Sequence, residues 1–224
     1  MNRNPKKQAL FTEFARITKA LAYATRLELL DFLCQAPRTV EALANLTGQS
    51  VATTSHHLRT LLASRLVATE KNGSYVTYRL ANKDVCEFWI SLQNLAHQQL
   101  ADLRQAAKEF LEGAEPYEPV DRETLLEKMR RGEVTLIDVR PQEEYEAGHL
   151  PGALSVPLEK LEELLPALPE DQEIVAYCRG PFCVLSQRAV KILSRHNRRA
   201  IRLSEGVPRW LEAGLPIEVG LPSV

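Results

Sequence analysis

The chain has 224 residues, of which 45% are hydrophobic and 25% charged, and its formal net charge is −1. This length predicts one or two domains, and the composition is that of an ordinary soluble protein. No apolar run approaches the roughly 18 residues that cross a bilayer, and the charged start MNRNPKKQAL has no apolar segment after it, so we expect neither a membrane span nor a secretory signal. Four cysteines in a chain of this length do not suggest a disulfide scaffold, so we expect a cytoplasmic protein.

The two halves of the chain differ in charge. Residues 1–112 carry 14 Lys and Arg against 10 Asp and Glu, a net charge of +4, whereas residues 113–224 carry 14 against 19, a net charge of −5. The first half suits approach to a polyanion, although +4 alone is weak ground for nucleic acid. The segment GAEPYEP, residues 113–119, combines glycine with two prolines and predicts a linker. We therefore expect one domain over residues 1–112 and a second over residues 120–224.

Helical patterns fill the beginning of the first half. The stretch FTEFARITKALAYATRLELLDFLCQ, residues 11–35, places leucines at helical spacing and predicts two helices. The stretch TVEALANLTG, residues 39–48, starts at an N-cap candidate, Thr39, and ends at Gly48. These residues therefore predict a third, short helix.

A fourth helix and a hairpin follow. The stretch SVATTSHHLRTLLASRL begins at Ser50 as the helix cap. Three leucines are expected on one face of this helix: Leu58, Leu61 and Leu62. The stretch LVATEKNGSYVTYRLA alternates around Asn72-Gly73, the strongest short hairpin signal that a sequence offers. We expect one long helix over about residues 83–111.

Two short helices joined by a turn and followed by a hairpin form a winged helix-turn-helix pattern. Such shapes also occur in proteins that bind no DNA. In a DNA reader, the second helix enters the major groove with its N-terminus first, and small, hydroxylated or basic side chains there contact phosphates and base edges. The candidate DNA-binding residues on this helix are Ser50, Val51, Thr53, Thr54, Ser55, His56 and Arg59. Those on the wing are Lys71, Asn72 and Tyr75.

The segment over residues 20–80 resembles the ArsR/SmtB family of bacterial winged-helix repressors, most specifically around Ser55 to Val67. The resemblance implies binding to double-stranded operator DNA and release when an inducer binds. It also implies a homodimer joined through the first and last helices of the domain. One departure is Arg65, where the family often has glycine at a helix end, so we expect the local turn to differ.

Many members of this family sense metals, but the family's thiolate motif needs cysteines within TVEALANLTG, which has none. A second family site, on the last helix, corresponds here to Asp84, Cys86, His97 and Leu100, and two of these four positions depart from the pattern. We therefore expect no metal site. Some relatives sense persulfides with a cysteine pair between the second and last helices, which makes Cys34 and Cys86 candidate regulatory thiols. The alternative is that both are small buried apolar residues.

The second half changes to an alternating pattern. VTLIDVR and EIVAYC are short apolar strand candidates, and LEKLEELLPAL and SQRAVKILSR are helical. This alternation predicts an α/β domain with a largely parallel sheet. We therefore expect a multidomain protein in which a mainly-α winged helix-turn-helix domain precedes an α/β domain.

A cysteine stands between the second of these strands and its following helix, in AYCRGPFCVLSQ. The thiolate is the reactive form of cysteine, and backbone N–H groups at a helix N-terminus stabilise it. We therefore interpret Cys178 as a catalytic nucleophile at the mouth of an amide-lined loop, in which Gly180 permits unusual backbone angles and Pro181 stiffens the turn. The anion-binding loop is expected to comprise Arg179, Gly180, Pro181, Phe182, Cys183 and Val184.

Several chemistries compete at this loop. A tyrosine-phosphatase site needs an arginine six places after the cysteine, where this chain has Val184. A zinc site lacks a second pair of ligands near the Cys-x4-Cys spacing. A dithiol redox site more often has the spacing Cys-x-x-Cys. Cys183 nevertheless remains a candidate regulatory thiol, because it can attack a persulfide on Cys178; the alternative is that it only shapes the pocket.

Flanking segments carry a second resemblance. LIDVRPQEEYEAGHLPGALSVPL and GVPRWLEAGLPIE resemble the signatures of rhodanese-like domains and bracket the cysteine loop over about residues 119–219. The resemblance implies that Cys178 carries sulfane sulfur as a persulfide taken from a small donor such as thiosulfate or another persulfide. Asp138 and Arg140 either support the loop or form a structural salt bridge, and His149 is expected to be structural. Arg179 either attracts an anionic donor or is merely solvated.

These patterns together predict a cytoplasmic transcriptional regulator whose C-terminal domain holds sulfur on Cys178, with no metal and no cofactor. Sulfur status is expected to alter operator affinity, through Cys178 itself or through Cys34 and Cys86. Two alternatives remain open. The protein is a sulfurtransferase enzyme with a localising or self-regulating DNA-binding domain, or it is an inactive rhodanese fold that senses arsenic or reactive sulfur through its thiols.

Overall fold

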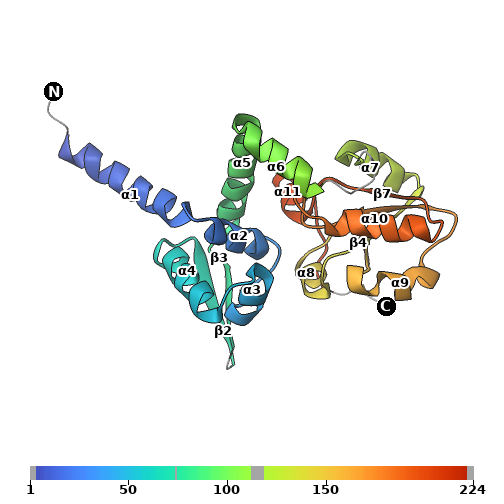
Figure 1. The fold of residues 1–224 in the computed structure, drawn as a ribbon, viewed down its shortest axis with the longest axis horizontal. Coiled ribbons are helices and arrows are strands. Elements are labelled where there is room, and N and C mark those ends of the chain that lie inside the picture. The colour runs from blue at the N-terminus through green and yellow to red at the C-terminus, as the bar shows by residue number, and fades with distance from the viewer. Residues whose placement is uncertain (1–3, 74, 112–118, 221–224) are drawn as a thin grey trace. The chain divides into compact units, whose positions relative to one another are not determined.

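A computed structural model describes residues 4–73, 75–111 and 119–220. The chain divides into two compact units, Met1–Leu92 and Gln93–Val224, which are described one at a time (Figure 1). The predicted linker lies outside the described residues except for Pro119. Among the described residues, no helix is both long and apolar enough to cross a membrane.

The first unit contains the helices expected from its leucine pattern. They are α1 (Pro5–Leu21), α2 (Ala24–Leu33), α3 (Val40–Thr47), α4 (Val51–Ala63) and the beginning of α5 (Lys83–Gln99). The predicted caps are confirmed: the Thr39 side chain accepts a hydrogen bond from the Ala42 N–H, and the Ser50 side chain accepts one from the Thr53 N–H. Gly48 ends α3 in the left-handed conformation, at φ 63°. Helices α3 and α4 form the predicted helix-turn-helix.

A small antiparallel sheet completes this unit. Its strands are β1 (Arg38–Thr39), β2 (Val67–Asn72) and β3 (Tyr75–Leu80), in the order β1-β3-β2. Asn72 pairs with Tyr75, so the chain reverses at the Asn-Gly dipeptide and the predicted wing is confirmed. The core beneath the sheet and helices is built mainly from leucines: Leu29, Leu30, Leu33, Leu43, Leu58 and Leu61. Leu62, which we expected on the same face, is 38% exposed because it lies one position beyond the buried stripe of α4.

The expected single helix over residues 83–111 is wrong in one respect, because it is divided. Helix α5 ends at Gln99, and α6 (Ala101–Leu111) begins after Leu100. The guanidinium of Arg104 donates to the carbonyl oxygens of His97 and Gln98, at 2.9 and 3.0 Å. Carbonyls at a helix C-terminus need such donors, so Arg104 caps α5 from the next helix.

The second unit contains a four-stranded sheet that is parallel throughout, in the order β5-β4-β6-β7. Its strands are β4 (Val134–Asp138), β5 (Leu154–Ser155), β6 (Glu173–Tyr177) and β7 (Ala200–Arg202). Its helices after α6 are α7 (Arg122–Arg130), α8 (Gln142–Ala147), α9 (Leu161–Leu164), α10 (Leu185–Arg195) and α11 (Val207–Glu212). Two short 3-10 turns, Leu158–Lys160 and Leu165–Ala167, flank α9. The expected parallel α/β domain is confirmed.

Successive residues of the central strands point to opposite faces of this sheet, as the strand period of two requires. Ile174 and Ala176 of β6 pack in the core that α9 and α10 cover. Val175 and Tyr177 pack in the other core, with residues of α7, α8 and α11. Both faces of the sheet are therefore buried. Because parallel sheets bind ligands at the carboxyl ends of their strands, we expect the functional site in the loops at that edge.

The turn after α4 gives a testable expectation. Arg65 stands where the resembled family often has glycine, and it adopts φ 58°. The left-handed turn is therefore kept, although the β-carbon of Arg65 makes this backbone conformation strained. Arg65 is exposed, so little packing depends on it. We expect Arg65→Gly to raise the free energy of unfolding by up to about 1 kcal/mol in urea titrations. Arg65→Ala, which keeps the β-carbon, should leave stability unchanged; an equal gain in both variants would refute strain as the cause.

Candidate functional site

The N-terminal part of α4 forms the candidate nucleic-acid interface of the first unit. Its predicted contact residues Val51, Thr53, His56 and Arg59 are exposed, and Ser55 is half-buried. The helix start has no acidic residue in its first turn, so its positive dipole end is not neutralised there. A surface of this kind is open to phosphate and base edges.

The structure alters the expectation for two of the predicted DNA-binding residues at the start of α4. Thr54 is fully buried, so it is removed from the candidate DNA-binding set. Its position is explained by the helical period, since the buried residues of α4 are Thr54, His57, Leu58 and Leu61. Ser50 is exposed, but its hydroxyl already accepts from the Thr53 N–H and lies 2.9 Å from the Thr53 hydroxyl.

The structure describes the side chains of two of the three predicted DNA-binding residues of the wing. Lys71 and Tyr75 are exposed on the two strands of the hairpin, and Tyr75 is 70% exposed. The side chain of Asn72 and the whole of Ser74 lie outside the described residues. The hairpin therefore presents a cation and an aromatic ring at its described end.

In the second unit, Cys178 directly follows β6, and its loop leads into α10. The loop runs from Arg179 to Val184, and its turn is closed by a hydrogen bond from the Cys183 N–H to the Gly180 carbonyl at 3.2 Å. Gly180 adopts φ 144°, a conformation that other residues rarely adopt. The Sγ of Cys178 lies 3.2 Å from the Ser186 hydroxyl, in the first turn of α10. The predicted order of strand, cysteine loop and helix is thus present.

The surroundings of Cys178 favour its thiolate. Burial raises the pKa of the thiol, but hydrogen bonds from the side chains of Cys183 and Ser186 and from the backbone N–H groups of Ser186 and Gly180 outweigh burial and lower the pKa to about 6. The usual value for a free cysteine is about 8.5. The groups at both ends of the loop therefore favour the thiolate of Cys178 over its thiol.

Cys183 takes the complementary role. Its hydrogen bond to the Cys178 sulfur raises the pKa of the Cys183 thiol, and burial raises it further. Both effects favour the protonated form of Cys183, which can donate to the Cys178 thiolate. In this state it is a hydrogen-bond donor, not a nucleophile.

Cys178 is more deeply buried than a residue at the mouth of a loop would be. Its exposure is 1%, and it packs in the core beside α10. Its sulfur nevertheless faces the loop amides, as the pKa shift and the contact with Ser186 show. Burial and amide contact coexist because the loop from Gly180 to Cys183 folds over the thiol.

Arg179 has a partner that the sequence did not suggest. Its guanidinium forms a two-armed ion pair with Glu144 of α8, with Nη2 to Oε1 at 2.7 Å and Nε to Oε2 at 3.0 Å. Glu144 is fully buried, so the charge of Arg179 is compensated inside the protein. The guanidinium therefore anchors the loop to α8 instead of standing free to attract an anion, contrary to one expectation.

Asp138 and Arg140 form a fully buried ion pair at the end of β4. Nη2 of Arg140 lies 2.6 Å from Oδ2 of Asp138 and 2.7 Å from the Gly148 carbonyl oxygen. The guanidinium lies over the ring of Tyr177, 5.7 Å from its centre, and Tyr177 immediately precedes Cys178. Of the two interpretations, this geometry favours structural support, transmitted to the loop through Tyr177.

His149 is also held by structural contacts. Its ring stacks on Tyr145 with the centres 3.7 Å apart, and its Nδ1 lies 2.9 Å from the Tyr145 carbonyl oxygen. Its Nε2 lies 3.6 Å from a Glu218 carboxylate oxygen. These contacts agree with the structural role expected for His149.

Sequence reasoning missed the contribution of Gly206. A β-carbon at this position would overlap the backbone carbonyls of Cys178 and Arg179, so only glycine lets the segment before α11 approach the cysteine loop. The signal was present, since Gly206 opens the quoted segment GVPRWLEAGLPIE. Its meaning depended on a contact with residues far away in the sequence.

We expect Gly206→Ala to displace the loop, to lower stability by about 1–3 kcal/mol and to prevent any loading of Cys178. Gly132→Ala is the matched control, because φ at Gly132 is +67° but nothing lies within 4 Å of an added β-carbon. That control should lower stability by about 1 kcal/mol through strain alone and leave the loop intact. Thermal unfolding measures the loss of stability, and the rate of alkylation of Cys178 reports whether the loop is displaced. Alkylation of Cys178 at the wild-type rate in Gly206→Ala would contradict the expectation.

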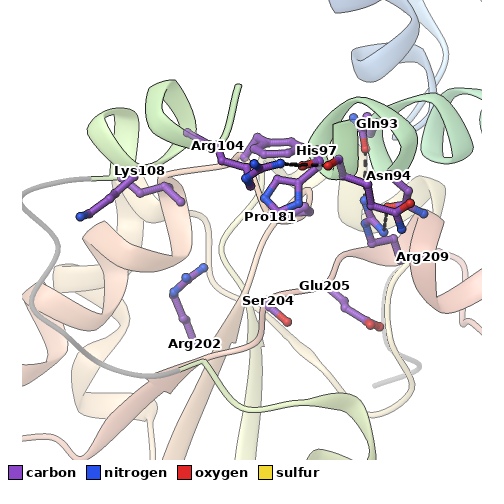
Figure 2. A pocket seen from close by; sticks show the side chains of 14 residues that line it. Gln93, Asn94, His97, Arg104, Lys108, Pro181, Arg202, Ser204, Glu205 and Arg209 are labelled. Carbon is purple, nitrogen blue, oxygen red and sulfur yellow. Dashed lines mark hydrogen bonds between the residues drawn. The ribbon is translucent and has the colours of Figure 1, made fainter. Parts of the chain in front are cut away.

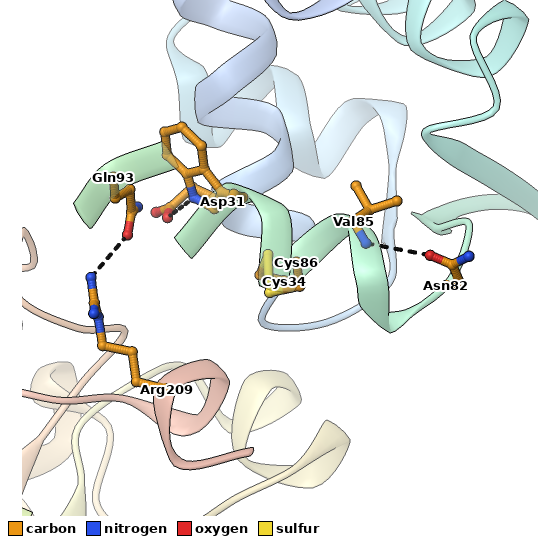
Figure 3. Close-up of a disulfide and its surroundings, with 8 residues drawn as sticks. Asp31, Cys34, Asn82, Val85, Cys86, Gln93 and Arg209 are labelled. Atoms are coloured by element: carbon orange, nitrogen blue, oxygen red, sulfur yellow. Dashed lines mark hydrogen bonds between the residues drawn. A yellow bond between two sulfur atoms is a disulfide. The ribbon is translucent and has the colours of Figure 1, made fainter. Parts of the chain in front are cut away.

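The remaining cysteines form a disulfide in the first unit. Cys34, just after α2, is bonded to Cys86 in the first turn of α5, with the Cα atoms 5.6 Å apart (Figure 3). The same two helices are joined by a hydrogen bond from Nε1 of Trp89 to Oδ1 of Asp31 at 2.8 Å. Cys34 and Cys86 are therefore not two separate apolar residues. Cys86, which was one of the four positions of the possible metal site on the last helix, is bonded to Cys34 and is not available as a metal ligand. Among the described residues, no group of three or more metal-binding side chains is found.

Comparisons with known proteins place both units. Residues 24–69 match the model of the bacterial regulatory protein, arsR family, and residues 121–213 match that of the rhodanese-like domain. The chain is 42% identical to the HTH-type transcriptional regulator Rv0324 of Mycobacterium tuberculosis over 97% of its own length and 95% of that protein. The chain belongs to the ArsR family of transcriptional regulators. Within that family it has a C-terminal rhodanese-like domain, as both sequence resemblances implied.

Other similarities of this ArsR-family chain cover one part each. A sulfurtransferase of Allochromatium vinosum is 29% identical and covers 44% of this chain and 92% of its own. A homodimeric winged helix-turn-helix DNA-binding domain from Mycobacterium bovis, described as a possible ArsR-family regulator, is 36% identical. It covers 46% of this chain and 94% of its own, with a TM-score of 0.42. The family models that match residues 24–69 and 121–213, and the full-length similarity to a transcriptional regulator, make the ArsR-family protein a DNA-binding regulator with a rhodanese-like domain.

Proposed function

We propose that this ArsR-family protein is a cytoplasmic, sulfur-responsive regulator in which Cys178 carries sulfane sulfur as a persulfide and the sulfur state of the protein changes operator affinity. The observation that carries the proposal is the position of the Cys178 sulfur, 3.2 Å from the Ser186 hydroxyl at the start of α10, where hydrogen bonds lower the pKa of its thiol to about 6. A thiolate with a low pKa is both the nucleophile and the form that holds a transferable sulfur. Small donors such as thiosulfate supply that sulfur. Because Cys178 is buried, uptake requires the loop over it to move.

The proposed partner of the first unit is a double-stranded operator, bound by a homodimer. Helix α1 carries three exposed aromatic or aliphatic side chains, Leu10, Phe11 and Phe14, each about 60% exposed. Apolar surface gathered in this way marks a protein interface in a soluble protein. The dimer would use α1 together with the last helix of the domain. Its operator-facing residues would be those of α4 and the wing that remain exposed.

The disulfide between Cys34 and Cys86 supplies the second part of the proposal. A thiolate of the reduced pair takes the outer sulfur from the Cys178 persulfide, which restores the Cys178 thiolate. The other thiolate then attacks the persulfidated cysteine and forms the disulfide, and HS⁻ leaves. Closing the disulfide ties α2 to α5 and so shifts the conformation of the DNA-binding unit.

Operator binding of the full-length protein tests this coupling. We would compare reduced wild type, Cys178→Ser and Cys34→Ser/Cys86→Ser, each with and without thiosulfate, by gel shift. Affinity that changes with the donor in the wild type but in neither variant supports the proposal. Unaltered binding in the wild type would remove the coupling. It would leave a sulfurtransferase whose DNA-binding unit serves location or self-regulation.

A second candidate function rests on the contact between the two thiols of the loop. The Cys178 sulfur lies 3.6 Å from the Cys183 carbonyl oxygen, and the Cys178 side chain raises the pKa of the Cys183 thiol, so both thiols belong to the same turn. Such a dithiol suits arsenite, a soft thiol-binding species, and an inactive rhodanese fold would then be its sensor. Arsenite titrations of wild type and Cys183→Ser discriminate, because only sensing through both sulfurs loses affinity in the variant.

A further inference from the structure

A pocket of about 570 Å³ lies in the second unit, at the carboxyl end of β7 (Figure 2). Its walls come from the end of α5, from α6, from the cysteine loop and from the segment that follows β7. The carboxyl ends of parallel strands are where open α/β sheets bind ligands. The described lining does not include Cys178, so a ligand of this pocket need not react with the thiol.

The lining of the pocket is rich in positive charge. Its cationic side chains are Arg104, Lys108, Arg202 and Arg209. The described lining also has a carboxylate, Glu205, but the oxygens of this group are paired with Arg122 at 2.7 and 2.8 Å. The pocket therefore has an excess of positive charge that its own carboxylate does not cancel.

The charges of three of these cations are available to a ligand. Within the part of the chain that the structure describes, neither Lys108 nor Arg202 takes part in an ion pair. Arg104 donates to two backbone carbonyl oxygens through Nη1, which positions its guanidinium without cancelling the charge. Arg202 is half-buried, and burial lowers the pKa of its guanidinium, whereas the negative charge of Cys178 raises it. A bound anion would offset the cost of burying Arg202.

The free cations and the rings occupy different parts of the pocket. Figure 2 shows Lys108 and Arg202 on one side and Asn94 on the other. His97 lies between the two sides, and its ring centre is 6.4 Å from that of Phe182 in the cysteine loop, which also lines the pocket. The pocket therefore has a cationic side, followed by aromatic rings and a carboxamide.

This arrangement restricts the chemical class of the ligand. Pockets of this volume hold organic molecules of many atoms. A phosphate group carries about two negative charges at neutral pH and is bound by both lysine and arginine. It therefore matches the cationic side better than a single carboxylate does. An aromatic base stacks on side-chain rings and pairs with carboxamides, so it matches the remainder of the lining.

We propose that this pocket binds a nucleotide, with its phosphate on Lys108, Arg202 and Arg104 and its base against Phe182 and His97. The proposal goes beyond the sulfur chemistry proposed above and does not depend on it. Because Phe182 belongs to the cysteine loop and His97 to α5, the bound nucleotide contacts both elements at once. The site is for an effector, and no bond of the nucleotide is made or broken there.

Isothermal titrations of AMP and of GMP into the reduced full-length protein test the phosphate side of the site. At least one of the two nucleotides should bind. Its affinity should fall about tenfold in Lys108→Gln and in Arg202→Gln, because each variant removes a charged donor from the phosphate. Lys108→Arg keeps the charge and should retain most of the affinity.

The base side is tested with ribose 5-phosphate, which is the same molecule as the nucleotide without its base. Ribose 5-phosphate should bind the wild type at least about tenfold more weakly than the nucleotide, because it lacks the stacking contact. Phe182→Leu should weaken the nucleotide by a similar factor and leave the affinity for ribose 5-phosphate unchanged. Equal affinities for the nucleotide and ribose 5-phosphate would overturn the assignment of a nucleotide.

Two control variants separate this pocket from other cationic surfaces. Lys160 is an exposed lysine of the second unit outside the pocket lining, and Arg59 is an exposed arginine of α4 in the candidate DNA interface. Lys160→Gln and Arg59→Gln should both bind the nucleotide as tightly as the wild type. A loss in Arg59→Gln would place the nucleotide on the DNA-binding surface and overturn the proposal. Absence of binding, or equal binding by all variants, would overturn it as well.

Discussion

Replacing Cys178 by serine is expected to abolish sulfur loading completely. Serine is nearly isosteric and keeps the contact with Ser186, but its hydroxyl does not ionise near neutral pH and forms no persulfide. Mass spectrometry of the wild type after incubation with thiosulfate should show an added sulfur atom on the peptide that contains Cys178. The variant should show none, and its thiosulfate:cyanide turnover should equal the rate in buffer. Equal loading in both proteins would exclude Cys178 as the carrier.

The pH dependence of loading follows from the same site. The pKa of Cys178 is lowered to about 6, so the thiolate predominates above that pH and is lost as the pH falls through it. We expect kcat/KM for thiosulfate to rise to half its maximum near pH 6 and to be level at neutral pH. A rate that continues to rise through about pH 8.5, the range of a free cysteine, would contradict the proposed stabilisation of the thiolate.

Removing single donors should move that midpoint upward. Ser186→Ala and Cys183→Ala each remove one hydrogen bond to the thiolate, and a bond to a charged group contributes about 1.5–3 kcal/mol, equal to about 1–2 pH units. Cys183→Ser keeps a donor in place and should restore most of the shift. A similar midpoint in Cys183→Ala and Cys183→Ser would show that Cys183 acts on the thiolate by some means other than donation.

Local signals in the sequence carried much of the fold. Thr39, Ser50 and Gly48 were identified as helix ends because capping depends on a few neighbouring residues. The Asn72-Gly73 hairpin and the cysteine loop before α10 are likewise local, and both lie where they were expected. The alternation of short apolar strands with helices was sufficient to predict a parallel sheet, because a parallel connection needs a crossover.

Contacts between residues that are distant in the sequence could not be predicted from local sequence signals. The ion pair of Arg179 with Glu144, the close approach of Gly206 and the donation from Arg104 to α5 carbonyls all join segments that only the fold brings together. Thr54 is a different case. Its spacing to His57, Leu58 and Leu61 placed it on the buried stripe of α4, but the expectation for DNA contacts weighed its hydroxyl above its position.

The buried ion pair of Asp138 and Arg140 carries the largest expected effect on stability. Both side chains are fully buried, and three hydrogen bonds join the carboxylate to the guanidinium. Burial lowers the pKa of Arg140, but the charge and hydrogen bonds of Asp138 raise it above its ordinary value. Asp138→Asn would leave this guanidinium charged in the interior without its counter-ion.

We expect Asp138→Asn to lower the free energy of unfolding of the second unit by about 3–5 kcal/mol. The chain has two tryptophans, Trp89 and Trp210, and the latter is buried in the second unit. In a Trp89→Phe background, urea titration followed by Trp210 fluorescence would report that unit selectively. The double variant Asp138→Leu/Arg140→Met removes both charges and should recover much of the loss.

An exposed pair provides the comparison for this prediction. Lys83→Gln breaks the pair with Glu87 on α5, in which the lysine side chain is 84% exposed, and should change stability by less than about 1 kcal/mol. Equal effects of Lys83→Gln and Asp138→Asn would refute a special role for burial. Because Arg140 lies over Tyr177 and Tyr177 precedes Cys178, the Asp138→Asn variant should also load sulfur poorly where it remains folded. Loss of stability with unaltered loading would show that the ion pair supports the sheet but not the cysteine loop.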